Sequence, residues 1–277
     1  DLIYKSTGRE KEVQKIQDEL NTIEYYHELN ETCLRENRKP LIDKMIFDLI
    51  DAFRADLVPA LVKPVKSEPK MPFLEAKMRT HGLGFISIAS IPTVTLPRIK
   101  AILSGKIPSF IDYILNLSAY KFSDESLVSL AHQAGKQMVF YGDNTWVDVF
   151  TREPFLRCNE TFSFFAWDYI QVDTNVTYNV MKEINDQKLL SQWDYMFLHY
   201  LGVDHIGHTQ GGPFSQIMNK KLIEMDHVIK TVYEKVSKLN QTYLIVVLGD
   251  HGMTDYGAHG GPTQEEVETA LIFLNTK

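Results

Sequence analysis

Short apolar runs alternate with amphipathic segments from Leu41 onward, and this alternation constrains the fold more than any other feature of the chain. Alternating strands and helices are typical of βαβ units, in which helices cover both faces of a mainly parallel sheet. Several runs are nearly continuous in Val, Ile, Leu and Phe, as strands buried on both faces require. The sequence therefore predicts an α/β fold with a mainly parallel central sheet. The predicted strands are Met45 to Ile50, Gly84 to Ala89, Gln137 to Tyr141, Tyr195 to Leu201, Tyr243 to Leu248 and Ala270 to Leu274.

Two segments between these strands carry signals of crossover helices. Ser123 is a candidate N-cap, with acidic residues in the next turn, and Gly135 lies just past the expected end. Apolar residues recur every three or four positions from Met218 to Leu239, which is helical periodicity. The stretch from Val58 to Pro72 contains four prolines and is predicted to be a surface loop.

The 277 residues divide into two predicted parts. Residues 1–39 carry alternating charges and are expected to be a peripheral N-terminal segment, whereas residues 40–277 carry the whole α/β pattern and are expected to form one domain. No run approaches the roughly 20 apolar residues that span a bilayer. Because the chain starts with Asp1, we expect it to be a portion of something larger, with any membrane anchor outside it.

Charge and sequence motifs limit the cellular compartments and the classes of partner that we expect for this chain. The net charge of -7 comes from 36 acidic against 29 basic side chains, with no dense basic stripe, so nucleic acid is not an expected partner. Cys33 and Cys158 are too few for a disulfide scaffold. N-glycosylation motifs favour a lumenal or extracellular domain. They lie at Asn30, Asn116, Asn159, Asn175 and Asn240.

Three aspartates follow apolar runs directly. MIFDLI is followed by Asp51, FLHYLGV by Asp204 and YLIVVLG by Asp250. Ligands of open α/β sheets bind outside the carboxyl ends of the strands, so parallel strands would place these carboxylates at one edge. A single aspartate at a strand end usually caps a helix, but three at one edge predict a site.

Histidines gather at two of the same strand ends. His208 lies four residues after Asp204, His251 follows Asp250 directly, and His259 lies in a glycine-flanked turn. Carboxylate and imidazole ligands together suit Zn²⁺ or another borderline divalent ion. His199, inside a predicted strand, and His205, beside Asp204, are expected to pack or to support the ligands.

A candidate nucleophile precedes a predicted helix in SIPTVTLPRIKAILSG. The helix is expected to begin near Leu96, which places Thr95 at its N-cap. A plain capping role is the alternative, but a hydroxyl near a divalent cation loses its proton more easily, and a helix N-terminus favours a phosphoryl anion. Arg98 and Lys100 add positive charge nearby and are candidate substrate-binding residues, the alternative being solvated cations on the helix face.

The strand-end motifs and the threonine motif described above belong to a set of six segments that resemble the alkaline phosphatase superfamily. Within it, they resemble the ethanolamine phosphate transferases of glycosylphosphatidylinositol (GPI) anchor synthesis, in particular the type that modifies the second mannose. The resemblance extends in order from about Lys39 to Asn275. The segments that carry it are IDAFRAD, PTVTLPRIKAILSGKIPSFID, VFYGDNTW, LHYLGVDHIGHTQGGP, KKLIEMD and GDHGMTDYGAHGG.

The resemblance implies an alkaline-phosphatase-like fold and two divalent metal ions, zinc or else manganese. It implies that phosphatidylethanolamine donates phosphoethanolamine to Thr95 and that a mannose hydroxyl of the GPI precursor then takes it. It also implies a domain on the lumenal side of the endoplasmic reticulum membrane and admits a membrane partner subunit. The implied ligands are Asp51, Thr95, Asp250 and His251 for one metal and Asp204, His208 and His259 for the other.

Two features qualify this interpretation. Asp143, after another predicted strand, is a candidate for binding the ethanolamine ammonium group, with turn capping as the alternative. Asp48 interrupts the first strand, where an unpaired buried carboxylate is costly, so that strand is expected to be shifted or partly exposed.

The competing functions are a secreted nucleotide pyrophosphatase or phosphodiesterase and a non-catalytic glycolipid-binding domain.

Overall fold

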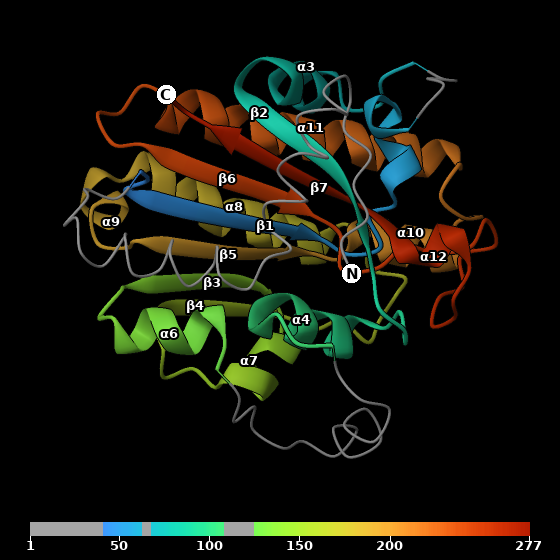
Figure 1. The fold of residues 1–277 in the computed structure, drawn as a ribbon, viewed down its shortest axis with the longest axis horizontal. Helices are drawn as coiled ribbons and strands as arrows, with labels where there is room; N and C mark the ends of the chain where they lie inside the picture. Colours follow the sequence, from blue (N-terminus) through green and yellow to red (C-terminus); the bar gives the residue numbers. More distant parts are fainter. Residues whose placement is uncertain (1–40, 63–67, 108–124) are drawn as a thin grey trace, which may run out of the picture.

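The computed structural model describes residues 41–62, 68–107 and 125–277 and contains one seven-stranded sheet with the order β2-β7-β6-β1-β5-β3-β4 (Figure 1). Strand β7 is antiparallel to both of its neighbours, and the other strands run parallel to one another. The predicted α/β class with a mainly parallel sheet is confirmed. The strands are β1 (Lys44–Ile50), β2 (Gly82–Ile88), β3 (Met138–Asp143), β4 (Phe155–Thr161), β5 (Tyr195–Tyr200), β6 (Tyr243–Leu248) and β7 (Glu268–Asn275).

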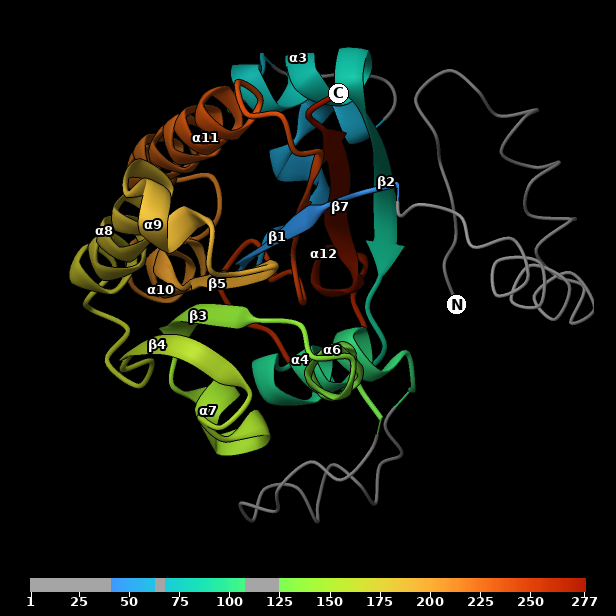
Figure 2. The ribbon, with the colours of Figure 1, turned by 90° about the vertical axis from the view of Figure 1, so that its left-hand side faces the viewer.

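Helices cover both faces of this sheet. Side chains of α3, α8 and α11 join the core on one face, and those of α4, α6 and α7 join the core on the other. Figure 2 shows α8 and α11 together on one side of the strands. The helices are α3 (Pro72–His81), α4 (Thr95–Ser104), α6 (Leu127–Gln133), α7 (Thr145–Phe150), α8 (Gln171–Asn185), α9 (Gln187–Leu190), α10 (Gly202–Thr209), α11 (Gln216–Val236) and α12 (Gln264–Val267), with 3₁₀ turns η1 (Ala55–Leu57) and η2 (Pro59–Leu61).

The central strand β1 is buried on both faces. Phe47 and Leu49 face one core, whereas Ile46 and Ile50 face the other. Asp48 points to the same side as Ile46 and is only 4% exposed, so the expectation of a shifted or partly exposed strand is wrong. Burial, together with nearby Asp173, raises the pKa of Asp48 to about 7. A neutral carboxyl group is tolerated there because protonation avoids a buried charge.

Some predicted boundaries differ from the structure. The N-cap of α6 is Ser126, whose hydroxyl accepts a hydrogen bond from the Ser129 amide; the predicted cap Ser123 was wrong and lies outside the described residues. Edge strand β4 was not predicted, because its largely polar sequence lacks a continuous apolar run. The predicted surface loop after Val58 begins with the buried turn η2.

Other predictions fall partly beyond the described residues. The segment 1–39, Cys33 and two glycosylation motifs lie outside them, whereas Asn159 lies on β4, Asn175 on α8 and Asn240 in the turn after α11. In the part of the chain that the structure describes, no helix has both the length and the apolarity needed to cross a membrane.

Candidate metal centre at the carboxyl edge of the sheet

The three predicted aspartates lie at one edge of the sheet. Asp51 follows β1 directly, Asp250 lies two residues beyond β6, and Asp204 lies in the first turn of α10, just after β5. Strand β1 pairs in parallel with both β5 and β6, so the three carboxyl ends are adjacent. All three carboxylates are buried.

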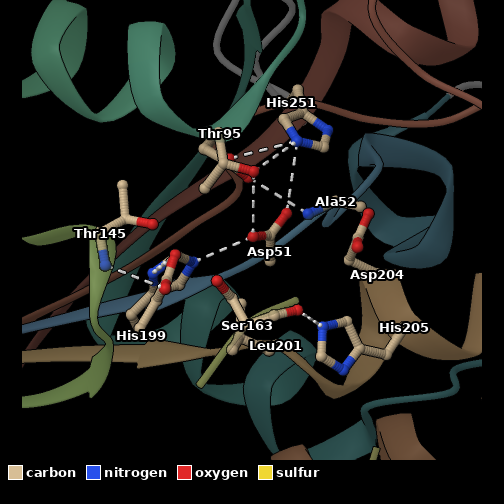
Figure 3. Close-up of polar contacts among 12 residues, drawn as sticks. Asp51, Ala52, Thr95, Thr145, Ser163, His199, Leu201, Asp204, His205 and His251 are labelled. Atoms are coloured by element: carbon tan, nitrogen blue, oxygen red, sulfur yellow. Dashed lines mark hydrogen bonds and ion pairs between the residues drawn. The ribbon is translucent and has the colours of Figure 1, made fainter. Parts of the chain in front are cut away.

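Asp51, Asp250 and His251 form one group of ligand atoms that lie within 4.8 Å of one another. His251 Nε2 lies 3.3 Å from Asp51 Oδ1 and 3.4 Å from Asp250 Oδ2. Thr95 Oγ1 lies 3.4 Å from His251 Nε2 and also 3.4 Å from Asp51 Oδ2 (Figure 3). The structure thus brings together the residues predicted for one metal.

A second group contains Asp204, His251 and His259. His208 adjoins it, because His208 Nε2 lies 3.3 Å from Asp204 Oδ1 and 3.1 Å from His259 Nε2. The rings of His251 and His259 stack with their centroids 4.1 Å apart. His251 therefore belongs to both groups, whereas the family resemblance implied that it serves only one metal.

The backbone orients the two stacked imidazoles. His251 Nδ1 lies 2.8 Å from the Gly252 carbonyl oxygen, and His259 Nδ1 lies 2.8 Å from that of Thr93. A carbonyl can only accept, so each Nδ1 donates, and in a neutral ring Nε2 keeps its lone pair. Burial lowers the pKa of His259, as does neighbouring His251, which favours the neutral ring. Both Nε2 lone pairs are available as metal ligands.

The acidic side chains fit a bound cation. Asp51 Oδ1 and Asp250 Oδ2 are buried and accept no hydrogen bond from the described residues. Burial raises the pKa of Asp51 well above its usual range, and repulsion from Asp250 and Asp204 adds to the effect. A divalent cation among these oxygens would supply the missing partner and remove the repulsion. Carboxylate and imidazole donors in this arrangement suit Zn²⁺.

Thr95 is the first residue of α4 and is partly exposed. The predicted N-cap assignment is off by one residue, because Val94 occupies the cap and provides no side-chain hydrogen bond. The Thr95 hydroxyl is therefore not used to cap its helix and instead faces Asp51 and His251. Its place at the helix N-terminus suits the binding of an anion.

Arg98 and Lys100 are buried, so the alternative of solvated helix-face cations is wrong for both. Arg98 Nε donates to the Asp250 backbone oxygen at 3.1 Å, and its guanidinium also donates to Ser90 Oγ. These contacts hold the strand end that carries Asp250 and do not favour direct substrate binding by Arg98.

Asp143 is the last residue of β3 and is also buried. Its Oδ1 accepts a hydrogen bond of 3.0 Å from the Thr145 amide, which is the turn-capping alternative. Because this carboxylate is enclosed, we do not include it in the proposed substrate site.

The other two histidines of this edge are His199, which contacts a proposed ligand, and His205, which packs against backbone carbonyl groups. His199 Nε2 lies 3.2 Å from Asp51 Oδ2. His205 lies on α10, and its ring nitrogens contact the carbonyl oxygens of Ser163 and Asp168 at 3.0 and 2.8 Å. Neither residue belongs to a ligand group among the described residues.

Sequence reasoning missed two supports of the centre. Thr93 Oγ1 accepts from the Gly260 amide and donates to the Gly261 carbonyl, each at 2.8 Å, and so holds the turn that carries His259. Asp173 accepts hydrogen bonds at the start of α10. A threonine in a loop and an aspartate in a helix carry no local signal for such long-range roles.

The mainly parallel sheet, the acidic and histidine groups at its carboxyl edge, and the threonine hydroxyl that faces them from a helix N-terminus define an alkaline-phosphatase-like fold and site. The family model described as type I phosphodiesterase / nucleotide pyrophosphatase matches residues 125–270, more than half of the chain. The chain belongs to this family.

Curated relatives with a more specific name match most of the chain. The human GPI ethanolamine phosphate transferase 2, catalytic subunit, is 42% identical over 241 residues, which cover 86% of this chain and 24% of the relative. The GPI ethanolamine phosphate transferase 2 of Schizosaccharomyces pombe is 40% identical over 245 residues, 84% of this chain and 31% of the relative. The chain thus spans about a quarter to a third of these relatives' length.

Solved structures share the fold at low identity. The C-terminal periplasmic domain of EptC from Escherichia coli, in complex with Zn, matches with a TM-score of 0.59 and 16% identity over 85% of this chain and 73% of that one. The Streptococcus pyogenes phosphoglycerol transferase GacH, in complex with sn-glycerol-1-phosphate, matches with a TM-score of 0.61 and 14% identity over 91% and 73%. These likenesses confirm the alkaline-phosphatase-like fold.

Proposed function

We propose that this domain transfers phosphoethanolamine from phosphatidylethanolamine to a mannose of a GPI-anchor precursor, through a covalent intermediate on Thr95. The names of the relatives that match most of the chain support the transferred group and the acceptor class. Their type, numbered 2, agrees with the sequence resemblance to the enzymes acting on the second mannose, which is the acceptor we propose.

One observation carries the proposal: the Thr95 hydroxyl lies 3.4 Å from both a carboxylate and an imidazole of the candidate metal centre. Thr95 Oγ1 donates to Asp51 Oδ2, which is therefore placed to receive the hydroxyl proton. The N-terminus of α4 lies beside it, where backbone N–H groups favour a phosphoryl anion. A partly exposed side chain can also meet a substrate from solution.

We propose two divalent ions, zinc or else manganese. Bound ions would polarise the phosphoryl group and lower the pKa of coordinated hydroxyl groups. The Zn complex of the structurally similar EptC domain and the carboxylate–imidazole donor set both support zinc. The proposed ligands are Asp51, Thr95, Asp250 and His251 for one ion and Asp204, His208 and His259 for the other.

Two displacements at phosphorus complete the transfer. Thr95 Oγ forms a bond to phosphorus while the bond to the diacylglycerol oxygen breaks, and diacylglycerol leaves with a proton. The mannose hydroxyl then forms a bond to the same phosphorus, loses its proton and displaces Thr95, whose hydroxyl is restored. His251 contacts Thr95 and also belongs to the group that contains Asp204 and His259, which supports a role for that group at the incoming and leaving oxygens.

Replacement of Thr95 tests this mechanism directly. Thr95→Ala should abolish transfer from labelled phosphatidylethanolamine to a mannosyl GPI precursor while zinc remains bound, and Thr95→Ser, which keeps the hydroxyl, should retain measurable transfer. Mass spectrometry of the wild-type chain quenched without acceptor should find phosphoethanolamine on the peptide that contains Thr95. Full transfer by Thr95→Ala would refute the nucleophile assignment.

The family model favours one competing function, hydrolysis of nucleotide diesters by a nucleotide pyrophosphatase or phosphodiesterase. Release of nitrophenol from a nitrophenyl nucleotide diester, at a rate equal to the transfer rate, would favour this alternative. The remaining competitor, a non-catalytic glycolipid-binding domain, predicts GPI binding with no Thr95 adduct.

We further propose that the domain faces the lumen of the endoplasmic reticulum and is held at the membrane by segments outside this chain, with or without a membrane partner subunit. The glycosylation motifs support a lumenal side, because Asn159 and Asn240 are exposed in the structure. A glycosidase should increase the mobility of the native protein on a gel, and an unchanged mobility would count against lumenal exposure.

A further inference from the structure

His199 is a buried polar residue that is closely packed by neighbouring elements. It lies on β5 with its side chain fully enclosed. Gly142 on β3 passes so close that a Cβ atom there would lie 2.6 Å from the Cβ of His199. A side chain at position 142 would therefore collide with the Cβ and the backbone of His199, so glycine allows β3 to approach β5 closely at this point.

Trp146 determines which ring nitrogen of His199 carries hydrogen. Its indole Nε1 lies 3.2 Å from His199 Nδ1, and an indole N–H can only donate. His199 Nδ1 must therefore accept, so the ring hydrogen lies on Nε2. The donor is held firmly, because Trp146 is fully buried and stacks on Phe140 with ring centroids 5.1 Å apart.

The hydrogen on His199 Nε2 faces a candidate metal ligand. Nε2 lies 3.2 Å from Asp51 Oδ2, and a carboxylate oxygen can only accept. The opposite orientation of donors would require Nδ1 to donate to Asp143 Oδ2, which is 3.9 Å away and beyond hydrogen-bonding distance. The two contacts thus form a chain with one direction, from Trp146 through His199 to Asp51.

We propose that Trp146 and His199 are positioning residues for the metal centre. Their hydrogen-bond chain holds Asp51 Oδ2 and so turns Asp51 Oδ1, which accepts no hydrogen bond among the described residues, toward His251 and the proposed ion. Without the chain the carboxylate can rotate and offer either oxygen to the metal. The inference rests on the metal-binding part of the proposed function.

The tautomer of His199 can be measured without any mutation. In the metal-free wild-type chain, two-dimensional ¹H–¹⁵N correlation of the histidine rings should show His199 as the Nε2–H tautomer. Trp146→Phe keeps an aromatic ring but removes the N–H, so this signal should change toward a mixture of tautomers. Observation of the Nδ1–H tautomer in the wild-type chain would overturn the inference, whether or not the chain binds metal.

Zinc affinity gives the functional measurement, by competition of Zn²⁺ with a chromophoric chelator. His199→Leu should weaken zinc binding about 10- to 100-fold, the usual effect of removing a partner of a metal ligand. His199→Gln, which offers an amide N–H, should recover part of this loss. Tyr141→Phe is the matched control, because it removes a buried hydrogen bond to Glu183 from β3 and does not contact the centre; it should leave affinity unchanged.

The outcomes separate the two proposals. Equal zinc affinity in His199→Leu and the wild-type chain would overturn the positioning role while leaving the metal centre intact. A wild-type chain that binds neither zinc nor manganese would refute the metal proposal, and with it the positioning role, whatever the tautomer of His199.

Discussion

Asp173 caps a helix from another part of the chain, and its removal should damage both stability and metal binding. Its Oδ1 accepts hydrogen bonds from the Leu201 and Gly202 amides at 2.9 and 3.0 Å, at the start of α10. Its Oδ2 forms an ion pair of 3.0 Å with Lys221 Nζ, and both side chains are almost fully buried. Because α10 carries Asp204 and His208, Asp173 supports two proposed ligands.

The expected magnitude follows from burial. Removing one member of a buried ion pair typically costs about 3–5 kcal/mol, because the other charge stays enclosed. Asp173→Ala should therefore lower the free energy of unfolding by about 3–5 kcal/mol. Asp173→Asn keeps an oxygen for the two amides but removes the charge that pairs with Lys221, so it should cost less than Asp173→Ala but still destabilise the domain. Removing Lys221 as well, in Asp173→Ala with Lys221→Met, should recover part of the loss, since the buried ammonium that keeps only Glu224 as a partner is also removed.

Urea unfolding and zinc stoichiometry are the measurements. Asp186→Ala is a matched control, because Asp186 Oδ1 also accepts from two amides, those of Lys188 and Leu189, but at an exposed position before α9. It should cost about 1 kcal/mol, as caps usually do, with zinc binding unchanged. If Asp173→Ala costs no more than this control, or keeps full zinc occupancy at the Asp204 group, the reasoning is refuted.

Two further predictions concern the ligands and the buried acid of β1. Asp204→Ala or His208→Ala should lower zinc stoichiometry from two to one, and elemental analysis that still finds two ions would contradict the assigned ligands. Asp48 has a folded pKa of about 7 against a usual value of 3.8, so its contribution to stability is lost as pH rises through that interval. Asp48→Asn should therefore be more stable than wild type at pH 8 by up to roughly 4 kcal/mol and lose this advantage near pH 4, measured by urea unfolding; an advantage independent of pH would contradict the buried-acid explanation.

Local pattern was sufficient for most of the fold. The run from Tyr243 to Leu248 was predicted with the bounds that β6 has in the structure, because a continuous apolar run is the direct consequence of burial on both faces. Strand β4 was missed for the same reason: it lies at the sheet edge, where partial exposure permits residues such as Arg157 and Glu160.

The candidate site was also largely predictable. Asp51, Asp204 and Asp250 were found from their positions after apolar runs, since parallel strands place those positions at one edge. The contacts of the neighbouring side chains were not predicted correctly. Arg98 was predicted to bind substrate, with a solvated helix-face cation as the alternative, but the backbone oxygen of Asp250, 152 positions away in sequence, accepts its hydrogen bond.

The sequence by itself determined the class of fold, the edge where the polar residues gather and the hydroxyl that faces them. Strand and helix periodicity are local signals, and any parallel sheet brings the carboxyl ends of its strands to one edge. Only the tertiary structure decided that His251 lies between both ligand groups, that Trp146 orients His199 toward Asp51, and that Asp173 holds the start of α10. These contacts depend on which strands become neighbours, and the order β2-β7-β6-β1-β5-β3-β4 arises from packing across the whole domain.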